Sequence, residues 1–163
     1  MHTENTAIRL RPVTDADLAV FRQMAQDPES NRMAAFTSQD PYDMAAFDAH
    51  WARIRADDTI VLRTVVDGTG TVVGNASVWG PPEERSVSYA IVRTHWGRGL
   101  ASAALAALLA EVTERPLHAR AAADNAGSLR VLTRNGFEIT ARETNWAHAR
   151  AADTEEYVLL LKA

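Results

Sequence analysis

The residues best suited to chemistry gather in two short stretches of the second half of the chain. The first stretch spans residues 95–101 (HWGRGLA), between a strand-like segment and an alanine-rich helix. Glycines at such a junction let the backbone fold around an anion and aim free N–H groups at it, while the helix dipole adds partial positive charge. The stretch is suited to a phosphate, although Gly-x-Gly alone is more often an ordinary strand-to-helix turn.

The second stretch spans residues 125–137 (NAGSLRVLTRNGF), which predicts a short helix that begins near Asn125 and ends at Asn135-Gly136. Neither stretch fits the common nucleotide loops. A Rossmann loop needs G-x-G-x-x-G and an acidic residue after the next strand, and a Walker loop needs Gly-Lys-Ser/Thr. The phosphate site therefore belongs to another class.

Taken together, the two stretches resemble motifs A and B of the GCN5-related N-acetyltransferase (GNAT) family, in its ribosomal-protein-alanine-acetyltransferase-like branch. Motif A of that family reads Gln/Arg-x-x-Gly-x-Gly/Ala. Gly99 and Ala101 are in register with it, whereas Trp96 stands at the first position, a substitution common in this branch. Motif B reads Asn-x-x-Ser followed by a helix and Gly-Phe, which matches Asn125, Ser128 and the pair 136–137.

The resemblance implies acetyl-coenzyme A as the acyl donor and no metal. Backbone amides of the loop would cradle the pyrophosphate, a strand edge would pair with the pantetheine amides, and motif B would hold the pantetheine arm from the other side. The implied coenzyme contacts are Tyr89, Ala90, Ile91, Gly97, Arg98, Gly99, Leu100, Ala101, Ser102, Asn125 and Ser128.

Acetyl transfer to an amine requires stabilisation of an oxyanion and a proton for the departing thiolate. The resemblance places the oxyanion donor at a backbone N–H near Ile91. Many relatives protonate the thiolate with a Tyr seven residues after the motif B Asn, where this chain has Leu132. In the ribosomal branch the Ser of Asn-x-x-Ser takes that role, which makes Ser128 the candidate acid. A helix-start hydroxyl bonded to the backbone is an equally good interpretation of Ser128.

The base that deprotonates the amine is less evident, because Ser86 stands where the branch often has a Glu. Glu143 and His148, in the last hairpin, lie near where related enzymes receive the amine, and a His is suited to take a proton at neutral pH. Deprotonation through water is the alternative. Trp79 and Trp146 are the candidate substrate-binding residues, since both lie where such a cleft is usually lined.

The surrounding elements predict an α/β fold, a mixed α+β sheet of about seven strands with four helices, as in the GNAT acyl-CoA N-acyltransferase fold. Residues 1–163 would form one N-acetyltransferase domain. Residues 27–31 are interpreted as a loop, and the strands before Thr94 and after Pro116 should be parallel neighbours because a helix joins them. The expected strands are 8–11, 59–66, 71–79, 86–92, 117–121, 137–144 and 155–161, and the expected helices are 15–26, 43–56, 100–114 and 126–134.

Composition narrows the function classes. The chain has 17 basic and 21 acidic residues, a formal charge of −4, so no overall positive field exists to hold nucleic acid. Its most apolar stretch, residues 100–112, is too short to span a bilayer, which takes about 20 residues. The polar start, residues 1–10, does not resemble a signal peptide, and we expect a cytoplasmic protein. With no Cys, no thiol can carry the acyl group.

The sequence therefore predicts an N-acetyltransferase that transfers an acetyl group from acetyl-CoA to a primary amine by direct attack in a ternary complex. The acceptor stays open among a protein N-terminus, an amino acid and a small-molecule amine. The alternative is a noncatalytic acyl-CoA-binding or sensing domain, favoured by the missing Tyr and the missing Glu. The resemblance also makes a homodimer through the last strands one expectation.

Overall fold

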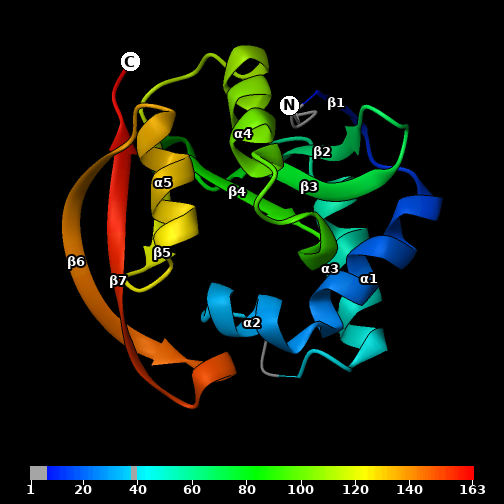
Figure 1. Ribbon diagram of the computed structural model, residues 1–163, viewed down its shortest axis with the longest axis horizontal. Helices are drawn as coiled ribbons and strands as arrows, with labels where there is room; N and C mark the ends of the chain where they lie inside the picture. Colours follow the sequence, from blue (N-terminus) through cyan, green and yellow to red (C-terminus); the bar gives the residue numbers. More distant parts are fainter. Residues whose placement is uncertain (1–6, 38–39) are drawn as a thin grey trace, which may run out of the picture.

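A computed structural model describes residues 7–37 and 40–163, so residues 1–6 of the polar N-terminal segment lie outside the described part. Within it the chain forms seven strands and five α-helices (Figure 1). The strands are β1 (Ile8–Pro12), β2 (Val61–Asp67), β3 (Val72–Trp79), β4 (Ser86–Ile91), β5 (Leu117–Ala122), β6 (Glu138–Ala147) and β7 (Ala152–Leu161). The helices are α1 (Leu18–Gln26), α2 (Pro28–Ala34), α3 (Met44–Ala56), α4 (Leu100–Glu111) and α5 (Ala126–Arg134).

The seven strands make one mixed sheet in the order β1-β2-β3-β4-β5-β7-β6. All neighbouring strands are antiparallel except β4 and β5, which α4 connects. The predicted α/β class and the parallel pairing of these two strands are confirmed. The parallel pair is short, however, since the only residues in register are Ser86 and His118. Beyond this pair, β4 and β5 separate and leave a gap between the two halves of the sheet.

Side-chain alternation gives the two faces of the sheet different roles. Val87 and Ile91 of β4 point to the face that α4 and α5 cover, where they join the main apolar core with Leu105 and Leu159. The N-terminal helices lie against the other face, where Phe21 of α1 stacks on Trp51 of α3 with ring centroids 4.9 Å apart. Trp51 of α3 is thus used for packing between helices.

A buried carboxylate fixes the start of α1 to that second face. Asp17 accepts hydrogen bonds from Arg11 at 2.8 and 2.9 Å, from the Thr14 N–H at 2.8 Å and from the Thr64 hydroxyl at 2.7 Å. Burial alone would raise the pKa of this carboxyl, but the hydrogen bonds outweigh it and hold the pKa well below its ordinary value. The carboxylate therefore stays ionised and ties β1, β2 and α1 together.

The prediction of a loop over residues 27–31 is wrong, because the chain forms α2 there and the fold has five α-helices instead of four. Asp27 is the N-cap of α2 and accepts from the Ser30 N–H at 2.9 Å, and Pro28 takes the first helical position. Asp followed by Pro is a helix-start signal, since the side chain caps the helix and proline lacks the N–H that would need a partner. The last hairpin is also longer than expected, with β6 ending at Ala147 and β7 beginning at Ala152.

None of the helices in the described residues is long and apolar enough to cross a membrane.

Candidate active site

The parting of β4 from β5 leaves the edge of β4 open. The Arg85 carbonyl accepts from the His118 N–H of β5 at 2.8 Å, and the Val92 N–H donates to the Val73 carbonyl of β3 at 2.8 Å. Because backbone polar groups alternate sides along a strand, the N–H and C=O groups of Tyr89 and Ile91 point into the gap. Those of Ala90 point to β3, so of the three predicted strand contacts only Tyr89 and Ile91 offer backbone groups to a ligand there.

Trp96 lies at the Ile91 end of this edge, where the gap is open. Its indole Nε1–H donates to the Ile91 carbonyl at 2.7 Å, which leaves the Ile91 N–H as the group that faces the gap. The side chain at the motif position where the family has Gln or Arg therefore holds the glycine loop, residues 96–102, against the end of β4. Sequence reasoning noted Trp96 as a substitution and assigned it no role.

The glycine loop fits an anion. Gly97 and Gly99 both have φ +77°, a left-handed conformation that favours glycine, and a Cβ added at Gly97 would meet no atom within 4 Å. Gly99 is the N-cap of α4 and supplies no side-chain cap. Within the described chain, the N–H groups of Leu100, Ala101 and Ser102 have no acceptor, as expected at an uncapped helix start. These donors and the open space suit a pyrophosphate.

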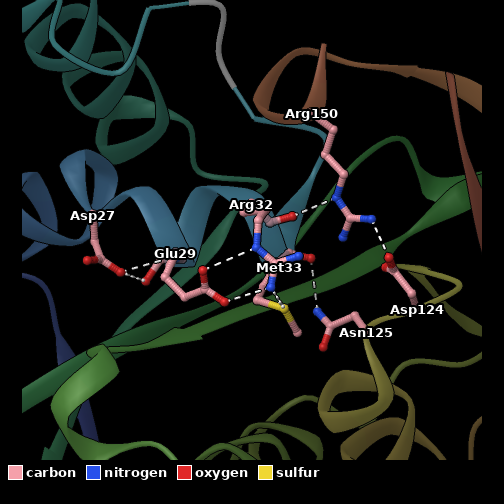
Figure 2. Close-up of polar contacts among 8 residues, drawn as sticks. Asp27, Glu29, Arg32, Met33, Asp124, Asn125 and Arg150 are labelled. Carbon is pink, nitrogen blue, oxygen red and sulfur yellow. Dashed lines mark hydrogen bonds and ion pairs between the residues drawn. The ribbon is translucent and has the colours of Figure 1, made fainter. Parts of the chain in front are cut away.

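Asn125, the predicted pantetheine contact, lies at a junction between distant segments (Figure 2). Its Nδ2 donates to the Met33 carbonyl of α2 at 3.2 Å, and its Oδ1 accepts from the Ser128 N–H at 3.1 Å as the cap of α5. In Figure 2, Arg150 from the β6–β7 hairpin donates to the Arg32 carbonyl at 2.9 Å and pairs with Asp124 at 2.5 Å. Both polar atoms of the Asn125 side chain are thus used within the protein.

Ser128 forms the shortest polar contact across the gap. Its Oγ lies 2.7 Å from the Tyr89 hydroxyl of β4, which is also 3.3 Å from the Ser128 carbonyl. Burial raises the pKa of Tyr89 to about 12, although the bond to Ser128 works in the other direction. Leu132, at the position where many relatives have a Tyr, is buried in the main core with 1% of its surface exposed. The chain therefore has no hydroxyl at position 132, but it has two hydroxyls, those of Tyr89 and Ser128, in contact between β4 and α5.

The closed end of the gap is the end where Ser86 pairs with His118. Beside it lies a cavity of about 220 Å³, here named the Trp79 hollow. Ser86 and Ser88 of its lining alternate with Val87, so the hollow lies on the face away from α4 and α5. The Trp79 indole Nε1–H donates to the Ser88 hydroxyl at 2.8 Å, which sets the ring over the outer end of β4. The hollow is lined by Trp79, Pro81, Glu84, Ser86, Val87, Ser88 and Arg120. It combines an exposed aromatic ring, two hydroxyls, one carboxylate and one guanidinium.

Arg120 connects the Trp79 hollow to the last hairpin. Its Nη1 donates to Glu143 at 2.5 Å and to Glu156 at 2.8 Å, and Asn145 donates to Glu156 at 2.9 Å. The hydrogen bond and the charge of Arg120 hold the pKa of Glu143 below its ordinary value. Glu143, a predicted base, thus lies on the side of the hollow but as a paired, ionised carboxylate.

Trp146 and His148 lie elsewhere. Trp146 pairs with Asp153 of β7, which lies three residues before the first β7 residue paired with β5, Glu156. Trp79 pairs with Ser86, toward the opposite ends of these strands. The Trp146 indole Nε1–H donates to His148 Nδ1 at 3.2 Å, so this ring nitrogen already has a partner. The structure does not bring the two predicted tryptophans, or the predicted bases, to one place.

Two polar residues at the site escaped sequence analysis. Arg120 lies in a central strand, and Glu156 has only 5% of its surface exposed. The position of Arg120 between Ala119 and Ala121 in a predicted strand was the available signal, because a charged side chain in a central strand needs a partner. In the described residues, no group of three or more His, Asp or Glu side chains is placed to hold a metal ion.

The sequence profile of the family described as Acetyltransferase (GNAT) domain matches residues 7–138. The chain belongs to this family, which confirms the resemblance of its two motifs and makes it an acyltransferase of the GNAT class. Among curated proteins, none matches the sequence.

Solved structures agree on the fold. A ribosomal-protein-alanine N-acetyltransferase from Brucella melitensis has 23% identity over 95% of this chain and 99% of that one, with a TM-score of 0.80. A spermidine N-acetyltransferase from Vibrio cholerae, in complex with CoA and spermine, has 14% identity over 96% and 97%, with a TM-score of 0.76. A phosphinothricin acetyltransferase from Sinorhizobium meliloti, in complex with AcCoA, has 17% identity over 94% and 86%, with a TM-score of 0.75. These neighbours share the architecture and are named for different amine substrates.

Proposed function

We propose that the protein transfers an acetyl group from acetyl-CoA to a primary amine by direct attack, with both substrates bound together. The observation that carries this proposal is the open edge of β4 that ends at the uncapped start of α4. A backbone edge and a set of free N–H groups, joined in one line, suit a ligand that has an amide-bearing arm and a pyrophosphate. A cytoplasmic location, where this donor is available, belongs to the proposal.

In this proposal the glycine loop, residues 96–102, binds the pyrophosphate and the Tyr89 and Ile91 edge pairs with the arm. Running back along β4 from Ile91 to Ser88 covers three residues, roughly 10 Å at about 3.3 Å per residue. The thioester then lies toward the closed end of the gap, where the Tyr89 N–H, which is closer to Ser88 than that of Ile91, can face its oxygen. Backbone donors held in place before the reaction stabilise an oxyanion without reorganisation.

The amine approaches from the Trp79 hollow, since this cavity opens beside the closed end of the gap on the face away from α4 and α5. Trp79 offers an aromatic surface to an apolar group or a cation, and Arg120 and Glu84 offer polar contacts. No Cys exists to hold the acyl group, which favours direct transfer. Ser128 donates to the departing sulfur, because its hydroxyl faces the gap from α5.

The base is proposed to be water, with Glu143 and His148 as the side-chain alternatives. Glu143 is paired with Arg120 and His148 accepts from Trp146, so each predicted base already has a partner. An amine that reaches the hollow in its neutral form needs only a route for its last proton after attack. The exposed rim around Trp79, which has 44% of its surface exposed, offers that route through solvent.

Two measurements test the function. Acetyl-CoA should raise the melting temperature, because a ligand bound only by the folded state stabilises it by about 2.7 kcal/mol at a hundredfold excess over Kd. Release of CoA thiol should then depend on an added amine, in a panel of a peptide with an N-terminal alanine, spermidine, phosphinothricin and free amino acids. If millimolar acetyl-CoA gave no thermal shift, the donor assignment would be wrong.

A second candidate function is a noncatalytic acyl-CoA-binding or sensing domain. It is favoured by the buried Leu132 in the Tyr position and by Ser86 in place of the branch's Glu. This domain would show the thermal shift and no amine-dependent thiol release with any member of the panel.

A further inference from the structure

Tyr89 of β4 and Ser128 of α5 carry two hydroxyls that are in contact beside the gap between β4 and β5. The 2.7 Å distance between their oxygens is that of a strong O–H···O bond, whereas the 3.3 Å contact of Tyr89 with the Ser128 carbonyl is long. The two hydroxyls share one short bond, and its direction decides what the Ser128 proton can do.

A phenol is a stronger acid than an alkyl hydroxyl, so Tyr89 is the better donor and Ser128 the better acceptor in this pair. With Tyr89 as donor, the hydrogen on Ser128 Oγ is not used in the pair. The Asn125 side chain already caps the Ser128 N–H at 3.1 Å, so the hydroxyl is not needed as a helix cap either. Ser128 therefore has a free hydrogen at the edge of the gap.

Building on the proposed function, we propose that Tyr89 is a positioning residue for the leaving group: it donates to Ser128 Oγ and thereby directs the Ser128 hydrogen to the sulfur of acetyl-CoA. As the amine nitrogen bonds to the carbonyl carbon and the carbon–sulfur bond breaks, the Ser128 O–H bonds to the negative sulfur. The amine's proton leaves to solvent, and the thiolate takes up a proton from water after release.

The acidities of the groups favour a hydrogen bond over a complete proton transfer. The pKa of Tyr89 is about 12, whereas an ordinary thiol has a pKa of about 8.5. A phenol this weak does not give up its proton to a thiolate, so Tyr89 stays neutral through the reaction. The pair takes the place of the tyrosine that the family's helix would carry at Leu132.

The test uses the full chain and compares Tyr89→Phe, Ser128→Ala and the double variant in thiol release with a responsive amine. We expect Ser128→Ala to lower kcat about 10²-fold. Tyr89→Phe should lower kcat about tenfold, the scale of coupling within one hydrogen-bond network, with the KM for acetyl-CoA and its thermal shift unchanged. The double variant should be no slower than Ser128→Ala alone, because Tyr89 acts through Ser128.

Tyr157→Phe is the matched control, since Tyr157 of β7 is half-buried against the same core, and it should keep the wild-type kcat. Several outcomes separate the inference from the proposed function. A Tyr89→Phe variant with full kcat beside a slow Ser128→Ala overturns the inference and leaves the acetyltransferase intact. So does a double variant slowed by the product of both effects, or a Tyr89→Phe whose loss is in CoA affinity. A wild-type protein that releases no CoA with any amine overturns the proposed function itself.

Discussion

The two sides of the gap are built in different ways. On the β4 side, the glycine loop and the strand edge present backbone groups, and the Trp96 side chain, five residues from the carbonyl it binds, holds the loop against the strand. On the β5–β7 side, the site depends on side chains from distant segments. Arg120 binds Glu156 36 residues away, and Asn125 binds Met33 92 residues away.

This difference separates a general binding role from a specific one. A backbone site recognises a ligand that does not change, and glycine spacing with a helix start is enough to make it. A side-chain site can be changed one residue at a time, which suits a family whose members are named for different amines. We therefore expect substitutions in the glycine loop and at the open β4 edge to affect acetyl-CoA, and those at Arg120 and Asn125 to affect the amine or stability.

The largest effect should follow substitution in the glycine loop. Gly97→Glu places a carboxylate where the pyrophosphate would lie and should weaken CoA binding at least a hundredfold, measured by calorimetry or thermal shift. Gly70→Glu is the control, because Gly70, in the β2–β3 turn, has φ +87° and open space for a Cβ. Both variants carry the same left-handed strain, roughly 1–2 kcal/mol. Equal loss of CoA binding in both would contradict a phosphate site at the loop.

The second effect belongs to the other side. Arg120→Met removes the guanidinium that binds Glu143 and Glu156, so the kcat/KM for the amine should fall about tenfold while the Kd of CoA is unchanged. The free energy of unfolding should fall by about 1–3 kcal/mol, because the buried Glu156 loses a partner. Arg142→Met, which breaks an exposed pair with Glu155, should change neither quantity. Weaker CoA binding in Arg120→Met would contradict the division between the two sides.

The same contrast explains what the sequence could predict. The succession of the seven strands along the chain follows from local patterns, and the parallel β4–β5 pair follows from the helix that joins these strands. The loop at 96–102 follows from two glycines before a helix. Helix α2 was missed although Asp27 and Pro28 carry its start signal, because a short polar run has no apolar periodicity. The partners of Arg120 and Asn125 lie across tertiary contacts that no local pattern describes.

A smaller effect, on stability, distinguishes a structural role of Asn125 from a role in binding the pantetheine arm. Asn125→Ala removes the cap of α5 and the bond to Met33, and we expect a loss of about 1–2 kcal/mol in unfolding free energy with CoA affinity unchanged. Asp43→Ala is the matched control, since Asp43 caps α3 through the Ala46 N–H at 3.0 Å and, among the residues that the structure describes, makes no comparable bond to a distant segment. Asn125→Ala should be the less stable of the two by thermal melting. A tenfold weaker CoA affinity at unchanged melting temperature would instead assign Asn125 to the pantetheine arm.

The smallest expected effect is that of Glu143→Gln on the pH profile. The hydrogen bond and charge of Arg120 lower the pKa of Glu143 below its ordinary value, so this carboxyl stays ionised to a lower pH than an ordinary glutamate. Across pH 6–9, where an amine gains its nucleophilic form, Glu143 is ionised throughout and its titration cannot shape the rate. The apparent pKa of kcat/KM should be the same in Glu143→Gln and wild type, since it then reports the amine or another group. A Glu143→Gln variant that loses the acid limb of the profile would make Glu143 the base and return the β6–β7 hairpin to the catalytic machinery.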